Sequence, residues 1–461
     1  MNIVNEFSDL IRKENNFDVS KRDLSFYIKQ NKQINISLFY SNFIVDMVKV
    51  NTIIESLNEI KLYEINISKQ ILNHLVNESV IEINNLIDAS NNFYNGQLII
   101  IIEEEHKIIS ADCRKYPGRL IGEPDSEKVV RGSRDGFTES MAINLGLIRM
   151  RIKSNKLNVE RYEIGNYSKT NVLLIYFQDE IDLKIINHVK ENLRKIDIKE
   201  LTMSDKALEE LLVNSKSSIY PLVKYTERPD TFVAHLYQGM FGIIVDTSPS
   251  AILGPVSIFD HMQHAEEYRQ TMIAGSYLRF IRFIGILFTY LLIPVWFMCI
   301  KEQLSFALFP KLFIINSSID KLFIELILIE LGIELVRMAS IHTPSALATS
   351  MGLIAGVVIG DLAIEAGIFS NNVVLLGSLS AIGSYITPSY ELSLANKIMK
   401  IGLIILTYLF SFWGLLFGLL LQIIYLVSLK SFTRSYLYPL IPFNFRKFLK
   451  QIFRTSYIKN N

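Results

Sequence analysis

The sequence predicts a multidomain membrane protein: a two-lobed α/β cytosolic N-terminal domain followed by an all-α transmembrane domain. Charged and apolar residues alternate up to residue 275, as in a soluble α/β domain, and long apolar runs follow. The chain is 50% hydrophobic, with a mean hydropathy of +0.27, which is high for a wholly soluble protein. We expect boundaries at 1–130 (first lobe), 131–275 (second lobe), 276–435 (membrane domain) and 436–461 (basic cytoplasmic tail).

Composition excludes several classes of function. A net charge of +1 argues against nucleic acid as a partner, and two distant cysteines, Cys113 and Cys299, exclude a disulfide framework. Nucleotide-binding glycine patterns and zinc spacings are absent, so we expect no enzyme activity, no cofactor and no metal. His261 and His264 form the only close histidine pair, and an ordinary surface helix explains them better than a metal site.

The first 275 residues show the periodicities of short strands and amphipathic helices. We expect strands at Gln33–Tyr40, Leu98–Ile102, His106–Ala111, Asn171–Phe177 and Phe241–Val245, and helices at Phe43–Leu57, Phe137–Ile152, Ile181–Ile196, Ser204–Val213 and Pro229–Tyr237. Asp135 is the expected N-cap of the second of these helices, and Pro229 the first-turn residue of the last. We expect no signal peptide, because Met1 to Ser20 lacks a continuous apolar run.

Five apolar segments in the second part predict about four spanning helices and one short re-entrant or interfacial element. Phe283–Ile300 is uncharged over 18 residues, whereas Val373–Ile386 is short and precedes Pro388. Ile401–Leu429 is uncharged for 29 residues, about 44 Å as one helix, so it is tilted or broken near Trp413.

The segment Leu322–Ala339 is less simple because it carries charge. Glu330, Glu334 and Arg337 share a helical face, which predicts an internal Glu–Arg pair one turn apart inside the membrane. The alternative is a helix that lies flat on the membrane surface.

Basic residues predict the orientation in the membrane. The last 32 residues hold seven basic residues and no acidic ones, which places this tail in the cytoplasm. Arg279 and Arg282 place the start of the first helix there too, so the number of crossings is even. The tail, interleaved with phenylalanines, either contacts anionic lipid or is a plain solvated tail.

A glycine stripe marks the apolar stretch from Ser345 to Phe369. Gly352, Gly356 and Gly360 recur every fourth residue, which lets two helix backbones approach closely in lipid. At about 100° per residue, the opposite face carries Leu347, Ile354, Val358, Asp361 and Glu365. We predict helix packing through the glycines and a pore on this face, with Ile354 and Val358 as an apolar gate and Asp361 and Glu365 as cation-attracting rings. The alternative is a bundle helix whose acids pair with Arg or Lys.

Charged residues are densest between Asp112 and Ser140, where they alternate in sign. Arginines before the helix at Phe137 could hold an anion at its N-terminus. An ion-pair network between lobes or between subunits is the preferred interpretation. The expected contact residues are Arg131, Arg134, Asp135 and Glu139, joined by Glu227 and Arg228 of the polar segment Tyr225–Asp230.

These motifs together resemble the A-subunit family of bacterial spore germination receptors, the GerA family. The resemblance rests on EPDSEKVVRGSRDGFTES (Glu123–Ser140), YTERPD (Tyr225–Asp230), GIIVDTSP (Gly242–Pro249), ELVR (Glu334–Arg337), AIEAG (Ala363–Gly367), TPSYELSLANK (Thr387–Lys397) and YPLIPFN (Tyr438–Asn444). RGSRDGF, ASIHTPS and TPSYELSLANK are most similar to the stage V sporulation protein AF subfamily. His342 stands where many receptor subunits have Arg, which weakens residue-level transfer from nutrient receptors.

The resemblance implies a multi-pass protein of the spore inner membrane that forms homo-oligomers, expected to be pentamers, around an ion-conducting pore. It implies release of monovalent cations from the spore core during germination, and partnership with other spore germination membrane proteins. One alternative is a non-conducting scaffold that clusters germination receptors or supports dipicolinate release. A transporter subunit is a third, which paired broken helices in duplicated halves would favour; we see no such repeat.

Overall fold

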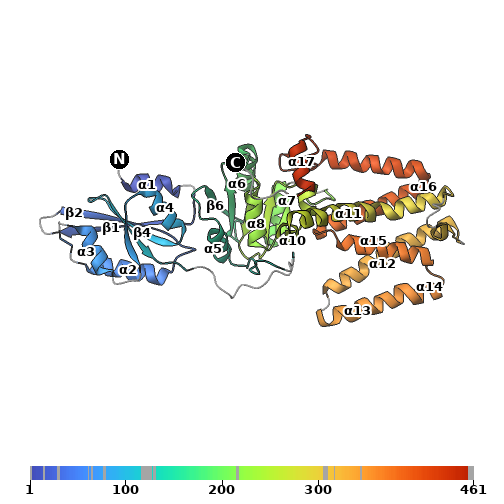
Figure 1. Ribbon diagram of the computed structural model, residues 1–461, viewed down its shortest axis with the longest axis horizontal. Helices are drawn as coiled ribbons and strands as arrows, with labels where there is room; N and C mark the ends of the chain where they lie inside the picture. The colour runs from blue at the N-terminus through green and yellow to red at the C-terminus, as the bar shows by residue number, and fades with distance from the viewer. Residues whose placement is uncertain are drawn as a thin grey trace. The chain divides into compact units, whose positions relative to one another are not determined.

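The computed structural model describes residues 3–13, 16–28, 32–60, 62–63, 66–75, 79–115, 127, 131–213, 218–304, 310–315, 317–342 and 345–454. The chain forms two compact units (Figure 1). The first consists of Met1–Lys216 with Val223–Pro255, and the second of Ser217–Leu222 with Val256–Asn461.

The first lobe of the first unit is an antiparallel five-stranded sheet covered by helices on both faces. Its elements are α1 (Ile3–Leu10), β1 (Val19–Ile28), β2 (Lys32–Ser41), α2 (Met47–Glu59), α3 (Ile67–His74), β3 (Val80–Ile83), α4 (Leu86–Tyr94), β4 (Gln97–Ile102) and β5 (Lys107–Asp112), with strand order β1-β2-β4-β5-β3. The side chains of β4 pack in the cores on both faces of the sheet, because alternate side chains of a strand point to opposite faces. Leu98 and Ile100 pack in the core with α2 and α3, whereas Ile99 and Ile101 pack with α1 and α4.

The second lobe repeats this architecture. Its elements are α5 (Met141–Arg151), β6 (Leu157–Ile164), β7 (Thr170–Phe177), α6 (Leu183–Lys195), α7 (Ser204–Val213), β8 (Lys224–Thr226), α8 (Pro229–Leu236), β9 (Phe241–Val245) and β10 (Ala251–Gly254), with strand order β6-β7-β9-β10-β8. The expected α/β class is therefore confirmed. Pro229 occupies the first turn of α8, as predicted.

A buried ion pair joins the two lobes of this unit. Arg149 of α5 donates through Nε and Nη2 to both carboxylate oxygens of Asp18, each at 2.8 Å, and both side chains are fully buried. The backbone N–H of Phe17 donates to the Val159 carbonyl oxygen at 2.9 Å. The predicted capping role of Asp135 is wrong: α5 begins four residues after Phe137, with Ser140 as its N-cap. Asp135 instead accepts hydrogen bonds from Ser133 and Arg151, which holds the loop before the helix.

The second unit is mainly helical. Its helices are α9 (Ile258–Met262), α10 (Ala265–Arg269), α11 (Met272–Lys301), the 3-10 turn η2 (Pro310–Phe313), α12 (Ile319–His342), α13 (Ser345–Val357), the π-helical turn η3 (Val358–Leu362), α14 (Ala363–Glu365), α15 (Asn371–Tyr385), α16 (Tyr390–Ser428) and α17 (Phe445–Ile452). A two-stranded ribbon, β11 (Lys430–Ser431) and β12 (Arg434–Ser435), precedes α17. Among the described residues, α11 and α16 are long and apolar enough to cross a membrane.

α16 is two helices, because Ser411 has non-helical backbone angles, φ 53° and ψ −129°. Gln422 Nε2 donates to the carbonyl oxygen of Met399 at 2.9 Å, so the second half folds back along the first. Gly414 makes this return possible: an added Cβ would lie 1.9 Å from the carbonyl oxygen of Leu406. The expected break near Trp413 is confirmed as a tight hairpin.

The hairpin changes the expected number of helical passes. Asp320 near the start of α12 accepts from Tyr408 Oη at 2.7 Å, close to the hairpin turn, whereas Arg337 reaches Ser393 near the start of α16. The described helices therefore form six segments that alternate in direction: α11, α12, α13 with α14, α15 and the two halves of α16. The expectation of four crossings treated Ile401–Leu429 as one span and Val373–Ile386 as a re-entrant or interfacial element. The number of these segments that cross the membrane stays a prediction.

The chain after α16 returns to the beginning of this unit. Val256 N–H donates to Ser431 Oγ, and Ile258 N–H to the Tyr436 carbonyl oxygen, both at 2.9 Å. Arg279 in the second turn of α11 donates to the Lys450 carbonyl oxygen of α17 at 3.0 Å. The helical passes therefore begin and end at the same level.

Candidate functional site

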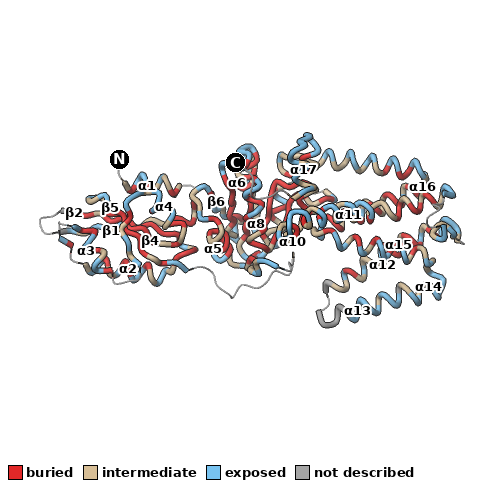
Figure 2. Tube along the Cα trace, viewed as in Figure 1, coloured by how far each residue is buried: buried red, intermediate tan, exposed pale blue. Residues whose placement is uncertain are grey.

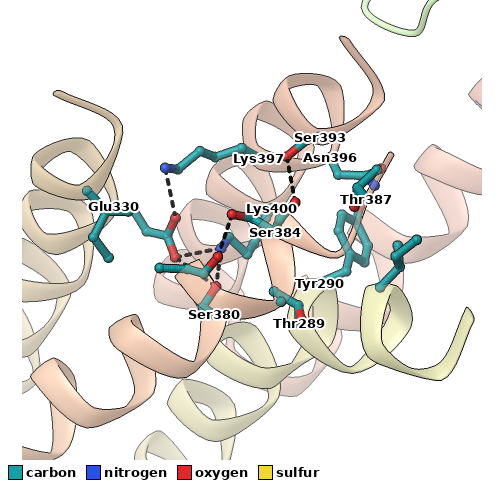
Figure 3. Close-up of a pocket in the computed structure, with 14 residues that line it drawn as sticks. Thr289, Tyr290, Glu330, Ser380, Ser384, Thr387, Ser393, Asn396, Lys397 and Lys400 are labelled. Atoms are coloured by element: carbon teal, nitrogen blue, oxygen red, sulfur yellow. Dashed lines mark hydrogen bonds and ion pairs between the residues drawn. The ribbon is translucent and has the colours of Figure 1, made fainter. Parts of the chain in front are cut away.

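Five charged side chains converge between α12 and α16 in the helical unit. Figure 3 shows three of them, Glu330, Lys397 and Lys400. Glu330, Glu334 and Arg337 extend from α12, and Lys397 and Lys400 from the first half of α16. Two turns of regular helix separate Glu330 from Arg337 and place the α12 residues on one face, as the spacing predicted. We call these five residues the charged cluster.

Lys400 and Glu330 form the inner pair of the charged cluster. Their ammonium and carboxylate atoms lie 2.6 Å apart, and each side chain is almost fully buried. Lys400 Nζ also donates to Ser380 Oγ of α15 at 2.6 Å, and Ser380 Oγ donates to Glu330 Oε1 at 3.4 Å. A buried ion pair is tolerated when hydrogen bonds satisfy its remaining polar atoms, and Ser380 serves that role here.

Lys397 and Arg337 share the outer carboxylate. Lys397 Nζ lies 2.9 Å from Glu334 Oε2, and Arg337 Nη1 lies 3.8 Å from the same oxygen. The predicted Glu–Arg pair one turn apart is thus present. Arg337 also donates to Ser393 Oγ at 3.2 Å, and its guanidinium stacks 4.4 Å from the centre of the Tyr390 ring. These contacts fasten the end of α12 to the beginning of α16.

The two lysines of the charged cluster were not among the predicted site residues. The apolar run of α16 was counted from Ile401, so Lys397 and Lys400 fell just outside it. The available signal was the charge itself: both lysines lie three residues apart on one face of a helix that continues directly into an uncharged stretch.

A small polar cavity lies beside the charged cluster, with a volume of about 30 Å³. Hydroxyl groups of Thr289, Tyr290 and Ser384 line it together with the side chains of Asn396 and Lys397 (Figure 3). A volume of roughly 10–15 Å³ holds one water molecule, so the cavity suits water rather than an organic ligand. The charged cluster has three cations for two carboxylates, and each carboxylate already binds cationic side chains. Its chemistry is that of a structural network, without a spare base or nucleophile.

Most of the described residues of the glycine-striped segment are exposed or half-buried (Figure 2). No atom lies within 4 Å of a Cβ built on Gly352, Gly356 or Gly360. Ile354 is 58% and Val358 49% exposed. Asp361 and Glu365 are exposed as well, and neither forms an ion pair with any residue that the structure describes. The described chain therefore leaves these glycines and the side chains of Ile354, Val358, Asp361 and Glu365 uncovered.

A π-helical turn interrupts this segment at Val358–Leu362. One extra residue in a turn rotates everything after it by about 100° relative to a continuous α-helix. The predicted alignment of Ile354 and Val358 with Asp361 and Glu365 assumed a continuous α-helix to Phe369. That assumption is wrong, since α14 ends at Glu365 and the two acids are displaced in phase from Ile354.

The predicted cytosolic contact residues all lie in the second lobe. Arg228 is buried and binds Asp230 at 2.9 Å, and it donates to the Ser133 carbonyl oxygen at 3.1 Å. The Phe137 N–H donates to the Glu227 carbonyl oxygen at 2.7 Å. Arg131, Arg134 and Glu139 are exposed.

These contacts of Arg228 and Glu227 order the loop before α5. Partnership of this cluster with another lobe or subunit stays a prediction. Part of the charged segment, residues 116–126 and 128–130, lies outside the described residues. Within the described ranges, no group of three His, Cys, Asp or Glu side chains could hold a metal ion. His264 instead caps α10, where its Nδ1 accepts from the Glu266 N–H at 3.2 Å.

Comparison with known proteins assigns the chain to a family. The family model "Bacillus/Clostridium GerA spore germination protein" matches residues 5–461. Stage V sporulation protein AF of Bacillus subtilis is 40% identical over 98% of this chain and 91% of its own length. Spore germination protein XA of Bacillus anthracis is 29% identical over 81% of this chain and 76% of its own. The crystal structure of the N-terminal domain of the A subunit of the Bacillus megaterium spore germinant receptor GerK3 covers 55% of this chain and 92% of that domain, at 23% identity and a TM-score of 0.43. Since the family model spans nearly the whole chain, this protein belongs to the GerA family of spore germination proteins.

Proposed function

We propose that this protein is a membrane subunit of an oligomeric ion channel that releases monovalent cations from the spore core during germination. One observation carries the proposal: α13 and η3 present a glycine stripe that no described residue covers, next to exposed acids. A helix of this kind needs a partner in the membrane, and copies of the same chain supply it.

In such a ring the exposed side of α13 and η3 lines the pore. Ile354 and Val358 form an apolar constriction that closes by dewetting, and Asp361 and Glu365 attract cations. The π turn sets the acids at a different angle from Ile354, so the two ring layers need not face the axis in the same state.

The charged cluster fixes the position of α12, which precedes α13 in the chain. It ties α12, from which α13 continues, to α15 and α16 through Glu330, Ser380 and Lys400. Arg131 and Arg134 make contacts between cytosolic lobes that couple ring assembly to the pore. We also propose the spore inner membrane as its location, with both termini cytoplasmic, on the core side. The basic residues at the start of α11 and after α16 support this orientation.

A non-conducting scaffold that clusters germination receptors is the second candidate. The observation in its favour is that every charge of the charged cluster is paired within the chain, so the best-ordered polar site of the membrane domain is structural.

Cation flux through the full-length protein in liposomes tests the proposal. We expect Val358→Ala to raise flux, because it widens the constriction, and Asp361→Asn to reduce the preference for cations over anions. Leu353→Ala is the matched control, since Leu353 is also exposed and apolar but points away from the proposed gate.

Equal flux for Val358→Ala and Leu353→Ala would remove α13 from the pore. Absence of flux from every correctly inserted variant, also after co-reconstitution with other germination membrane proteins, would favour the scaffold.

A further inference from the structure

The short helix α17 has an apolar side that the described residues leave exposed. Phe445 and Leu449 lie one turn apart on this side and are 60% and 36% exposed. Phe453, just past the helix, is 51% exposed. Arg446, Lys447 and Lys450 occupy the opposite side, and all three are exposed. An amphipathic helix that exposes its apolar side needs a partner that offers an apolar layer to one side of the helix and a polar layer to the other.

The position of α17 on the fold identifies this level. Arg279 of α11 donates through Nη1 to the carbonyl oxygens of Lys450 and Gln451 at 3.0 and 3.2 Å. The backbone N–H of Arg454 donates to Ser276 Oγ at 3.0 Å. These three hydrogen bonds attach α17 and the residues just after it to the first two turns of α11. α11 is long and apolar enough to span a membrane. A segment held at the end of a spanning helix lies at the bilayer–water boundary.

The anchor of α17 on α11 is rigid. Arg279 and Glu267 of α10 form a buried ion pair at 2.7 Å, with each side chain almost completely inaccessible to solvent. Phe448 packs against Phe259 of α9, with ring centres 6.1 Å apart. These contacts use the backbone and one aromatic side chain of α17, and they leave Phe445 and Leu449 free to contact something else.

Charge distinguishes between the possible partners. From Lys430 to the end of the chain there are seven basic residues and no acidic one. A zwitterionic surface gives such a segment no electrostatic gain, whereas the anionic headgroups of a bilayer attract each lysine or arginine near them. We propose that α17 is an interfacial helix that inserts Phe445, Leu449 and Phe453 into the bilayer and binds anionic lipid headgroups through Arg446, Lys447 and Lys450.

Site-specific fluorescence in nanodiscs tests this assignment on the full-length protein. An environment-sensitive dye such as NBD is attached at Phe445→Cys, and at Lys447→Cys on the opposite side as the control. Cys113 and Cys299 are retained, because both are buried. The discs contain either phosphatidylcholine alone or a mixture with phosphatidylglycerol, each with and without lipid that carries a shallow doxyl quencher.

We expect emission at position 445 to shift to shorter wavelength and to be quenched by doxyl lipid, with a larger effect in phosphatidylglycerol. Position 447 shows little quenching in either lipid. Arg446→Gln with Lys450→Gln, two exposed side chains whose loss leaves the backbone anchor intact, abolishes the advantage of phosphatidylglycerol.

Two results would overturn the proposal. Quenching at 445 no greater than at 447 means that α17 is solvated or covered by protein. Equal quenching at 445 in both lipids, unaffected by the two glutamine substitutions, means apolar contact without recognition of anionic headgroups. Neither result depends on ion conduction, so the test is independent of the proposed channel function.

Discussion

Glu330 contacts both lysines of the charged cluster, with Lys400 at 2.6 Å and Lys397 at 4.0 Å. A buried carboxylate that loses its closest cation keeps its desolvation cost, and breaking such a pair costs about 3–5 kcal/mol. We expect Lys400→Met to lower the thermal unfolding midpoint of the protein in detergent. Glu330→Gln with Lys400→Met recovers part of this loss, because the variant no longer buries an unpaired charge.

Glu365→Gln serves as the control for this series, because Glu365 is exposed and should not change the midpoint. A Lys400→Met variant as stable as the wild type would show that the pair contributes no net stability.

His235 in α8 gives the stability of the second α/β lobe a pH dependence of known sign. Burial, with a smaller effect of nearby Lys224, lowers the pKa of His235 to about 3. In the unfolded chain the pKa of His235 is about 6.5. Below that pH the unfolded state therefore binds a proton that the folded state does not bind. The stability contribution is fully present above pH 6.5 and falls as the pH drops toward 3, by about 2 kcal/mol at pH 5.

We expect the unfolding midpoint of the full chain in detergent to fall between pH 7 and pH 5, and to fall less in His235→Leu. His74→Leu, at an exposed histidine, should retain the fall of the wild type. Equal falls in all three proteins would contradict the assignment to His235.

At the scale of the element, the hairpin in α16 makes a sharp prediction. Met399 and Gln422 touch, although 23 residues of continuous helix would separate them by about 35 Å. We expect Met399→Cys with Gln422→Cys to form a disulfide under mild oxidation, detected by mass spectrometry of linked peptides. Met399→Cys with Phe410→Cys is the control, because eleven residues of the first half of the hairpin separate those positions by about 17 Å. Failure of the first pair to link would favour one continuous spanning helix.

The sequence predicts the position of the hairpin turn at Ser411 only approximately. A run of 29 uncharged residues is too long for one span, so a bend was predictable from length. The residue at the bend was not, since Ser411 adopts a positive φ that glycine favours, and neighbouring Gly414 serves close packing instead. Local sequence preference and the observed turn therefore point to different residues.

On the scale of the whole molecule, a packed glycine and an exposed glycine give separate tests of folding and of the proposed oligomer. A Cβ on Gly377 would lie 2.7 Å from Ile329 Cγ1, whereas a Cβ on Gly356 would meet nothing within 4 Å. We expect Gly356→Leu to leave the folded monomer intact and to abolish the oligomer, measured by light scattering coupled to size-exclusion chromatography. Gly377→Leu should instead lower the unfolding midpoint, because α12 and α15 must separate. An oligomer of unchanged size in Gly356→Leu would place the subunit interface elsewhere.

Sequence alone determined those features that depend on local periodicity, run length and charge. These include the α/β class of the N-terminal part, the apolar helices, the shared face of Glu330, Glu334 and Arg337, and the family. The family rests on short sequence motifs. Each of the other features depends on the spacing of residues within one helix or strand. The boundary between units was not local: contacts divide the chain at Pro255 and exchange residues 217–222.

Tertiary structure decided which charges meet. Lys397 and Lys400 lie more than 60 residues from Glu330 and Glu334, and only the packing of α12 on α16 shows that they neutralise each other. The same packing left Asp361 and Glu365 without cationic partners in the described chain, although all four acids lie in apolar surroundings in the sequence. An ion pair depends on distance in space, because the cost of burying each charge is offset only by a partner within a few ångströms, and spacing along the chain does not fix that distance.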